Sequence, residues 1–264
     1  LPHKNLIPDI NLTPYSIWLA TVVVSGISYL SYLLKRYVFH ESGVLVSGII
    51  GGLYSSTATI SVLARKSRKA SEQEANEYVA AMLLAVSMMF LRFMILILIF
   101  SREIFTSIYP YLLIMSVVAS VVAWFIHSRH RRSKDMTDES EDEDSSNPLE
   151  FKVALIFATL FVVFTVLTHY TLVYAGTGGL NLLSFVSGLS DITPFILNLL
   201  QNTGSVAVLV VVACSMQAII SNILVNMFYA LFFAGKGSKL RPWILGGFGT
   251  VIGVNLVLLL FFYL

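Results

Sequence analysis

The chain has 264 residues, of which 56% are hydrophobic and 12% are charged, and its formal net charge is +2. Soluble domains carry about 25% charged residues, so this composition excludes a disordered chain and argues against a soluble domain. It predicts an all-α polytopic membrane protein, and the small net charge gives no sign of a nucleic-acid partner.

Eight apolar segments follow one another along the chain, and most have the length of about 20 residues that a helix needs to cross a bilayer. Because a helix satisfies its own backbone hydrogen bonds in lipid, we expect helices rather than strands. The segments cover residues 16–34, 44–64, 78–100, 108–126, 153–172, 182–200, 206–233 and 243–264.

A charged stretch, residues 128–150, separates the fourth apolar segment from the fifth. It is first basic and then acidic, which predicts a solvated linker. The linker divides the chain into repeat one, residues 1–127, and repeat two, residues 151–264, each with four membrane segments.

The two halves resemble each other when the sequence is shifted by 136 residues. The stretch Gly43–Leu63 then lies over Gly179–Leu199 without a gap, and six of the 21 positions are identical. This match and the repeated order of segments predict an internal duplication, a common way in which secondary transporters are built.

The basic residues distinguish two topologies. If all eight segments cross the membrane, the loops divide Lys and Arg ten to six between the two sides. If the second segment of each half enters and leaves on one side, the halves are inverted and the division becomes fourteen to two. The positive-inside rule favours the inverted arrangement.

The second segments also have compositions that weaken a helix. Gly48–Thr59 reads GIIGGLYSSTAT, and Ser184–Thr193 reads SFVSGLSDIT and is followed by Pro194. Glycine, serine and proline disfavour a continuous helix, which predicts broken or re-entrant segments. The alternative is two ordinary spans that pack through pairs of small residues four positions apart.

Only two formally charged residues lie deep inside apolar segments, Arg92 and Asp191. A charge at the bilayer centre costs about 2.5–3.5 kcal/mol, so each needs a partner or a polar cavity. We expect the two to pair across the repeat interface, either as a functional cation or proton site with Arg92 as the counter-charge or as a structural salt bridge.

Hydroxyl and amide side chains near these charges complete a candidate ion or substrate path. Ser55 is the counterpart of Asp191 in the first half, and the seventh segment carries two asparagines four positions apart. The alternative is ordinary hydrogen bonding within and between helices. The candidate path residues are Ser55, Ser56, Thr57, Thr59, Asp191, Thr193, Asn222 and Asn226.

Enzyme signatures are absent from the sequence, which has no GxSxG, HExxH or P-loop motif. We therefore expect no enzyme and no cofactor, although an intramembrane hydrolase that uses Asp191 or Ser55 stays open. His and Cys are too few and too scattered for a zinc or iron site.

Several motifs in combination are similar to a known family. They are LTPYSIWLATVVVSGISY (Leu12–Tyr29), GGLYSSTAT (Gly51–Thr59) with the ARKSRK that follows, MMFLR (Met88–Arg92), NPLEFKVAL (Asn147–Leu155), SGLSDIT (Ser187–Thr193) and SN (Ser221–Asn222). The chain resembles domain of unknown function 4010, the C-terminal membrane domain of MgtC/SapB-family proteins. Asn226 stands where the resemblance leads us to expect a basic residue.

This resemblance implies an MgtC-like membrane domain before Leu1, a place in the cytoplasmic (inner) membrane of a prokaryote, and a role in magnesium or ion homeostasis. Two functions remain open. One is a transporter or channel for Mg²⁺, Na⁺, K⁺ or protons. The other is a regulatory or scaffold protein that acts by helix contacts in the bilayer. Under either function we expect a homodimer.

Overall fold

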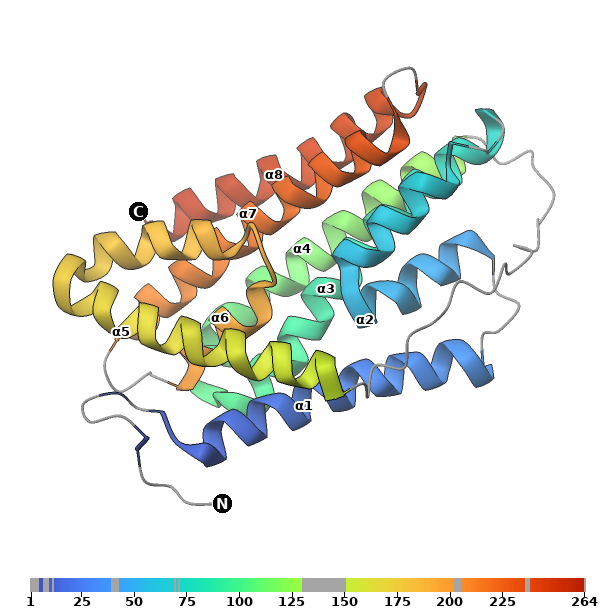
Figure 1. Cartoon of the computed structure of the whole chain (residues 1–264). Coiled ribbons are helices and arrows are strands. Elements are labelled where there is room, and N and C mark those ends of the chain that lie inside the picture. Colours follow the sequence, from blue (N-terminus) through green and yellow to red (C-terminus); the bar gives the residue numbers. More distant parts are fainter. Residues whose placement is uncertain are drawn as a thin grey trace.

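The computed structural model describes residues 5–6, 10, 12–38, 43–68, 70, 72–129, 151–201, 206–235 and 238–263, and the backbone alone for 72–74, 151–153 and 262–263. The regular structure of this part is helical (Figure 1). The charged linker predicted for residues 128–150 lies outside the described residues from 130 on.

Eight α-helices and one π-helical turn, η1, make up the described fold. By length and composition alone, seven of the helices could cross a membrane, whereas α6 has only ten residues. The predicted helical membrane protein is therefore confirmed. The elements are α1 (Pro14–Leu33), η1 (Leu34–Val38), α2 (Val44–Lys66), α3 (Glu72–Phe100), α4 (Arg102–Ser128), α5 (Phe151–Ser187), α6 (Ile192–Gln201), α7 (Val208–Ala234) and α8 (Arg241–Tyr263).

Local sequence signals explain where the first and fourth helices begin. Thr13 caps α1 in a capping box with Ser16, and Pro14 occupies the first helical position, where its missing N–H costs nothing. Ser101 caps α4 by accepting a hydrogen bond from the N–H of Ile104.

Helix α2 is not a straight span but two half-helices that turn back on each other at Ser55. This residue has extended dihedral angles, φ −158° and ψ 107°. A Cβ placed on Gly51 would lie 2.5 Å from Oγ1 of Thr59, although eight residues of straight helix span about 12 Å. Both ends of α2 therefore lie at the same end of the bundle (Figure 1), and we call α2 the first hairpin.

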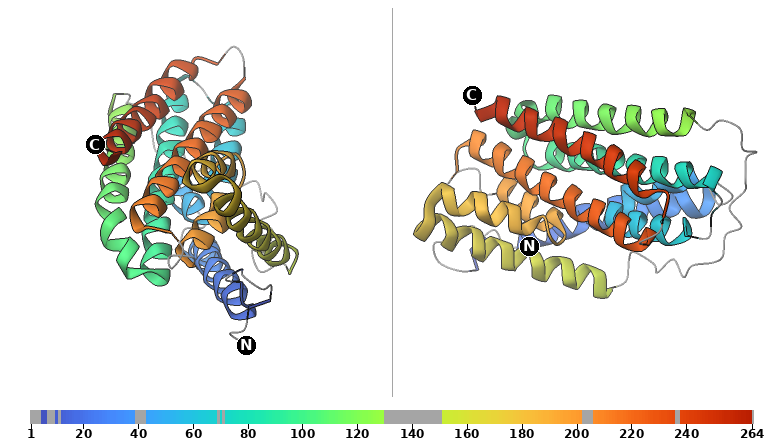
Figure 2. Two further views of the ribbon diagram at one scale, coloured as in Figure 1. Left: turned by 90° about the vertical axis from the view of Figure 1, so that its left-hand side faces the viewer. Right: turned by 90° about the horizontal axis from the view of Figure 1, so that it is seen from above.

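A second hairpin, residues 177–201, is formed by the last part of α5 together with α6. Gly176 has φ 61° and ψ −153°, a conformation that glycine alone adopts readily, and it reverses the chain between residues 151–175 and 177–187. The chain then leaves the helix at residues 188–191 and returns as α6. Figures 1 and 2 show that this hairpin enters from the end of the bundle opposite the first.

These two hairpins favour re-entrant second segments over eight full spans. A ten-residue α6 is about 15 Å long, half of what a crossing needs. The predicted span 182–200 is therefore two short helices, and the span 44–64 is broken at Ser55. The element order is the one that the inverted topology requires, while the duplication itself stays a prediction.

Among the described residues, basic side chains gather toward one end of the bundle. The start of α1, the end of α3 and the Gly176 bend lie at one end, whereas the end of α1, both ends of α2 and the end of α4 lie at the other (Figure 1). The second end carries most of the described basic residues, among them Lys35, Arg36, Arg65, Lys66, Arg68, Arg129, Lys239 and Arg241. Arg102 lies at the first end.

Helices α3 and α7 form the centre of the bundle. The first hairpin and α4 pack against α3, the second hairpin and α8 pack against α7, and the first hairpin also contacts α7. Large apolar side chains of α4 and α8 remain exposed, including Trp124 and Phe261, as expected for helices that face lipid. This arrangement directs the tips of both hairpins toward the interior of the bundle.

Candidate functional site

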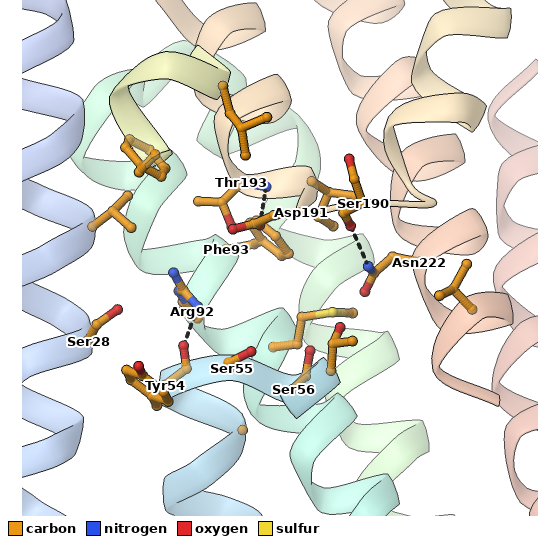
Figure 3. A pocket seen from close by; sticks show the side chains of 18 of the residues that line it. Ser28, Tyr54, Ser55, Ser56, Arg92, Phe93, Ser190, Asp191, Thr193 and Asn222 are labelled. Carbon is orange, nitrogen blue, oxygen red and sulfur yellow. Dashed lines mark hydrogen bonds between the residues drawn. The ribbon is translucent and has the colours of Figure 1, made fainter. Parts of the chain in front are cut away.

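The tips of the two hairpins meet at a cavity of about 360 Å³ (Figure 3). The first hairpin contributes Tyr54–Thr57, and the second contributes the stretch from Leu189 to Thr193. Helices α1, α3, α5 and α7 complete the walls. Ser25 and Asn222 lie near the middles of the full-length helices α1 and α7, so the cavity lies near the middle of the bundle.

At the tip of the first hairpin, the break exposes backbone groups at the ends of two half-helices. The freed carbonyl of Tyr54 accepts a hydrogen bond of 2.7 Å from Nη1 of Arg92 on α3. Ser55 begins the returning half-helix, and its Oγ accepts a 3.4 Å hydrogen bond from the N–H of Ala58. Ser55 therefore acts as an N-cap, and the positive side chain of Arg92 caps a C-terminal end.

The tip of the second hairpin is built in the same way from different residues. Oδ1 of Asp191 accepts a 2.9 Å hydrogen bond from the N–H of Thr193 and so caps the N-terminus of α6. Nδ2 of Asn222 on α7 donates to the carbonyls of Gly188 at 3.3 Å and Ser190 at 3.4 Å. In the second hairpin, the neutral amide of Asn222 thus takes the place at a helix C-terminus that Arg92 takes in the first hairpin.

Behind Asn222 lies Asn226, which is fully buried one turn further along α7. Its Nδ2 donates to Oδ1 of Asn222 at 3.1 Å. This bond leaves Nδ2 of Asn222 to point toward the carbonyls of the second hairpin. Asn226 therefore positions Asn222 and lies outside the cavity wall.

The two charged residues share the cavity but do not pair directly. Arg92 is partly buried and Asp191 is exposed, and the two face each other across the cavity (Figure 3). Within the described part of the chain, no hydrogen bond or salt bridge joins them. The two charges attract each other across the cavity, but no direct pair forms because each group binds a backbone group that a helix break has freed.

The cavity brings together most of the predicted path residues. Thr59 and Asn226 are the exceptions, since Thr59 lies against Gly51 inside the first hairpin and Asn226 lies behind Asn222. The predicted residues that line the cavity are Ser55, Ser56, Thr57, Arg92, Asp191, Thr193 and Asn222.

Sequence reasoning missed several polar groups of the cavity wall. Ser25 and Ser28 of α1 line the cavity. They are about one helical turn apart and share a face, a spacing that is visible in the first apolar segment. Tyr54 contributes its backbone carbonyl, and no sequence pattern marks which carbonyl a break will free. Among the described residues, no group of three or more His, Cys, Asp or Glu side chains could hold a metal ion.

Comparison with known proteins places this architecture in a family. Residues 22–234 match the family described as domain of unknown function (DUF4010). An uncharacterized protein of Aquifex aeolicus (strain VF5) is 27% identical over 221 residues, which cover 83% of this chain and 94% of that protein. No solved structure matches the chain. The family match covers both hairpins and the cavity between them, and the chain belongs to the domain of unknown function 4010 family.

Proposed function

We propose that this integral membrane protein is a transporter that binds a cation at Asp191, in the cavity between the two hairpins. The observation that carries the proposal is an exposed carboxylate at the middle of an apolar helical bundle, which faces Arg92 across the cavity but forms no salt bridge among the described residues. An ionised carboxylate at this depth is costly unless a cation, a proton or water compensates it. Broken helices that end at the midplane are typical of substrate and ion sites in secondary transporters.

The groups around Asp191 favour a weakly hydrated cation or a proton. Hydroxyl oxygens of Ser55, Ser190 and Thr193 line the same cavity and could replace part of a hydration shell. Mg²⁺ prefers six oxygen ligands in octahedral geometry and gives up water reluctantly, so one carboxylate is a sparse ligand set for it. Resemblance to MgtC/SapB-family proteins is the argument for Mg²⁺, and the site chemistry supports Na⁺, K⁺ or a proton at least as well.

A non-transporting scaffold is the second candidate, and the surface of α8 favours it. Gly249 and Gly253 are exposed, with open space where a Cβ would stand. Small residues four positions apart let two membrane helices approach closely. Under this hypothesis a second copy packs on α8, and loss of the Asp191 charge changes assembly rather than ion movement.

Ion flux into liposomes separates the two functions. We expect the purified protein to carry at least one of Na⁺, K⁺, Mg²⁺ or protons, and Asp191→Asn to lower that flux at least about tenfold, because the substitution removes the charge that binds the cation. Glu103→Gln is the matched control, since Glu103 is an exposed carboxylate in the first turn of α4.

Two results would contradict the transporter. One is the absence of flux for all four ions in liposomes that contain folded protein. The other is a flux that Asp191→Asn and Glu103→Gln leave equally unchanged. A shift in oligomeric state of the Asp191→Asn protein, without any flux in the wild type, would favour the scaffold.

A further inference from the structure

The cavity holds a second charge that a cation alone leaves uncompensated. We propose that Arg92 binds the carboxylate of a small organic solute, which enters the cavity together with the cation at Asp191. This inference rests on the proposed transport function and names its substrate class. Four observations carry it: the unused donors of Arg92, the polarity of its surroundings, the charge balance and the size of the cavity.

Arg92 has more N–H donors than the hydrogen bonds of the described structure use. A guanidinium carries five N–H donors, and Nη1 makes one hydrogen bond, to the carbonyl of Tyr54. Nε is buried and has no hydrogen-bond partner among the described residues. An unsatisfied donor on a charged group is costly, so a ligand that accepts hydrogen bonds from the guanidinium would be favoured. The planar fork of a guanidinium suits the two oxygens of a carboxylate.

The groups next to Arg92 also favour an anion. The returning half of the first hairpin starts after Ser55, so its N-terminal end is directed at the cavity. The first N–H groups of a helix lack partners within it and form the positive end of its dipole. Ser28 of α1 adds a hydroxyl donor on this side (Figure 3).

Charge balance favours joint binding of an anion and a cation. A cation at Asp191 neutralises that carboxylate but leaves the Arg92 charge at the centre of the bundle, where it also repels the entering cation. A monovalent carboxylate at Arg92 removes both costs. Phosphate carries between about −1.5 and −2 charge at neutral pH, as its esters do, and would leave an excess of negative charge.

The cavity is larger than an ion requires. Its volume is about 360 Å³, whereas a water molecule occupies about 30 Å³ of liquid and pockets for small organic ligands begin at about 300 Å³. A short carboxylate, or an amino acid whose ammonium group reaches Asp191, fits this space and leaves room for water.

Thermal unfolding of the protein in lipid nanodiscs tests the assignment, with acetate and glycine as probes. At matched sodium concentration and ionic strength, we expect both to raise the unfolding midpoint relative to chloride. The shift should be about 3 to 6 °C at roughly ten times Kd. Arg92→Gln should abolish this shift and Arg92→Lys should reduce it. Arg102→Gln, at an exposed arginine of α4, should leave it unchanged.

A second measurement uses the wild-type protein and so does not depend on folding of a variant. Phenylglyoxal modifies arginine side chains, and peptide mass spectrometry reports the rate at each one. We expect acetate to slow modification of Arg92 at least about tenfold at ten times Kd. The same concentration should leave Arg102 unaffected.

The proposal is overturned if neither acetate nor glycine differs from chloride in the wild type. It is equally overturned if the shift persists in Arg92→Gln, if Arg92 is not protected, or if phosphate alone stabilises the protein. Carboxylate binding without any cation flux would uphold the role of Arg92 and defeat the proposed function. Cation flux that depends on Asp191 but does not respond to carboxylates would uphold the proposed function and defeat the role of Arg92.

Discussion

Gly52, like Gly48 one turn earlier, is a residue at which the first hairpin packs closely against the central helix α3. A Cβ at this position would lie 2.5 Å from Cα of Ala85, and a backbone atom inside a packed helix cannot move aside as a side chain can. The absence of a side chain at residue 52 therefore sets how closely the hairpin packs and where its tip lies.

Gly26 in α1 provides a matched control for a substitution of Gly52. We expect Gly52→Ala to lower the free energy of unfolding by about 1–3 kcal/mol, because overpacking displaces the hairpin from α3. Gly26→Ala should be neutral or stabilising, by up to about 1 kcal/mol, since residue 26 has open space and alanine favours a helix. Thermal unfolding in one detergent compares the two, and equal effects would contradict the close packing.

At the level of elements, the first hairpin is attached to α7 at the basic end of the bundle. Arg68, just after the hairpin, donates through Nη2 to the carbonyl of Phe232 at 3.2 Å and through Nε to that of Phe233. Arg65 lies 4.3 Å above the ring of Phe233. These carbonyls belong to the last turn of α7, where C=O groups have no hydrogen-bond partner within the helix. The contacts therefore couple the hairpin to the helix that carries Asn222.

Hydrogen exchange measures this coupling. We expect Arg68→Gln to speed amide exchange in the last turn of α7 about tenfold or more, because a hydrogen bond to a charged group contributes about 1.5–3 kcal/mol. Lys35→Gln removes an exposed charge from the same end of the bundle and should leave that turn unchanged. Equal exchange in both variants would show that the contacts of Arg68 do not hold the hairpin to α7.

For the whole molecule, the hairpins decide which loops share a side of the membrane. We expect cysteines introduced as Lys35→Cys and Ala70→Cys to be labelled from one face. Thr177→Cys and Ala207→Cys should be labelled from the other. The background is Cys214→Ser, since the native cysteine is buried. Labelling of residues 35 and 70 from opposite faces would mean that α2 crosses the membrane.

Much of the arrangement of the whole molecule could be predicted from the sequence. Apolar runs of about 20 residues located the helices, because length in lipid is a physical requirement. The small residues of the second segments pointed to a break, and the positions of lysine and arginine pointed to a hairpin. The Gly176 reversal was not predicted, because α5 continues past residue 172, where the fifth apolar segment ends.

The contacts of the charged residues could be predicted less well than their location. Arg92 and Asp191 stand out in the sequence because charges at membrane depth are rare. Their partners are the Tyr54 carbonyl and the Thr193 N–H, which become available only where a helix ends. A direct pair was predicted because side chains are visible in a sequence and freed backbone groups are not.

The position of the hairpin tips has an electrical consequence. Each hairpin ends near the middle of the bundle, so under the proposed transport function an ion that reaches Asp191 from one side would have crossed about half of the bilayer. Moving one elementary charge across the whole membrane changes its electrical energy by about 2.3 kcal/mol at 100 mV, and moving it halfway changes the energy by about 1 kcal/mol. A resting membrane potential would thus change the occupancy of Asp191 by a monovalent cation several-fold. A neutral pair formed by a carboxylate and that cation would enter without sensing the potential.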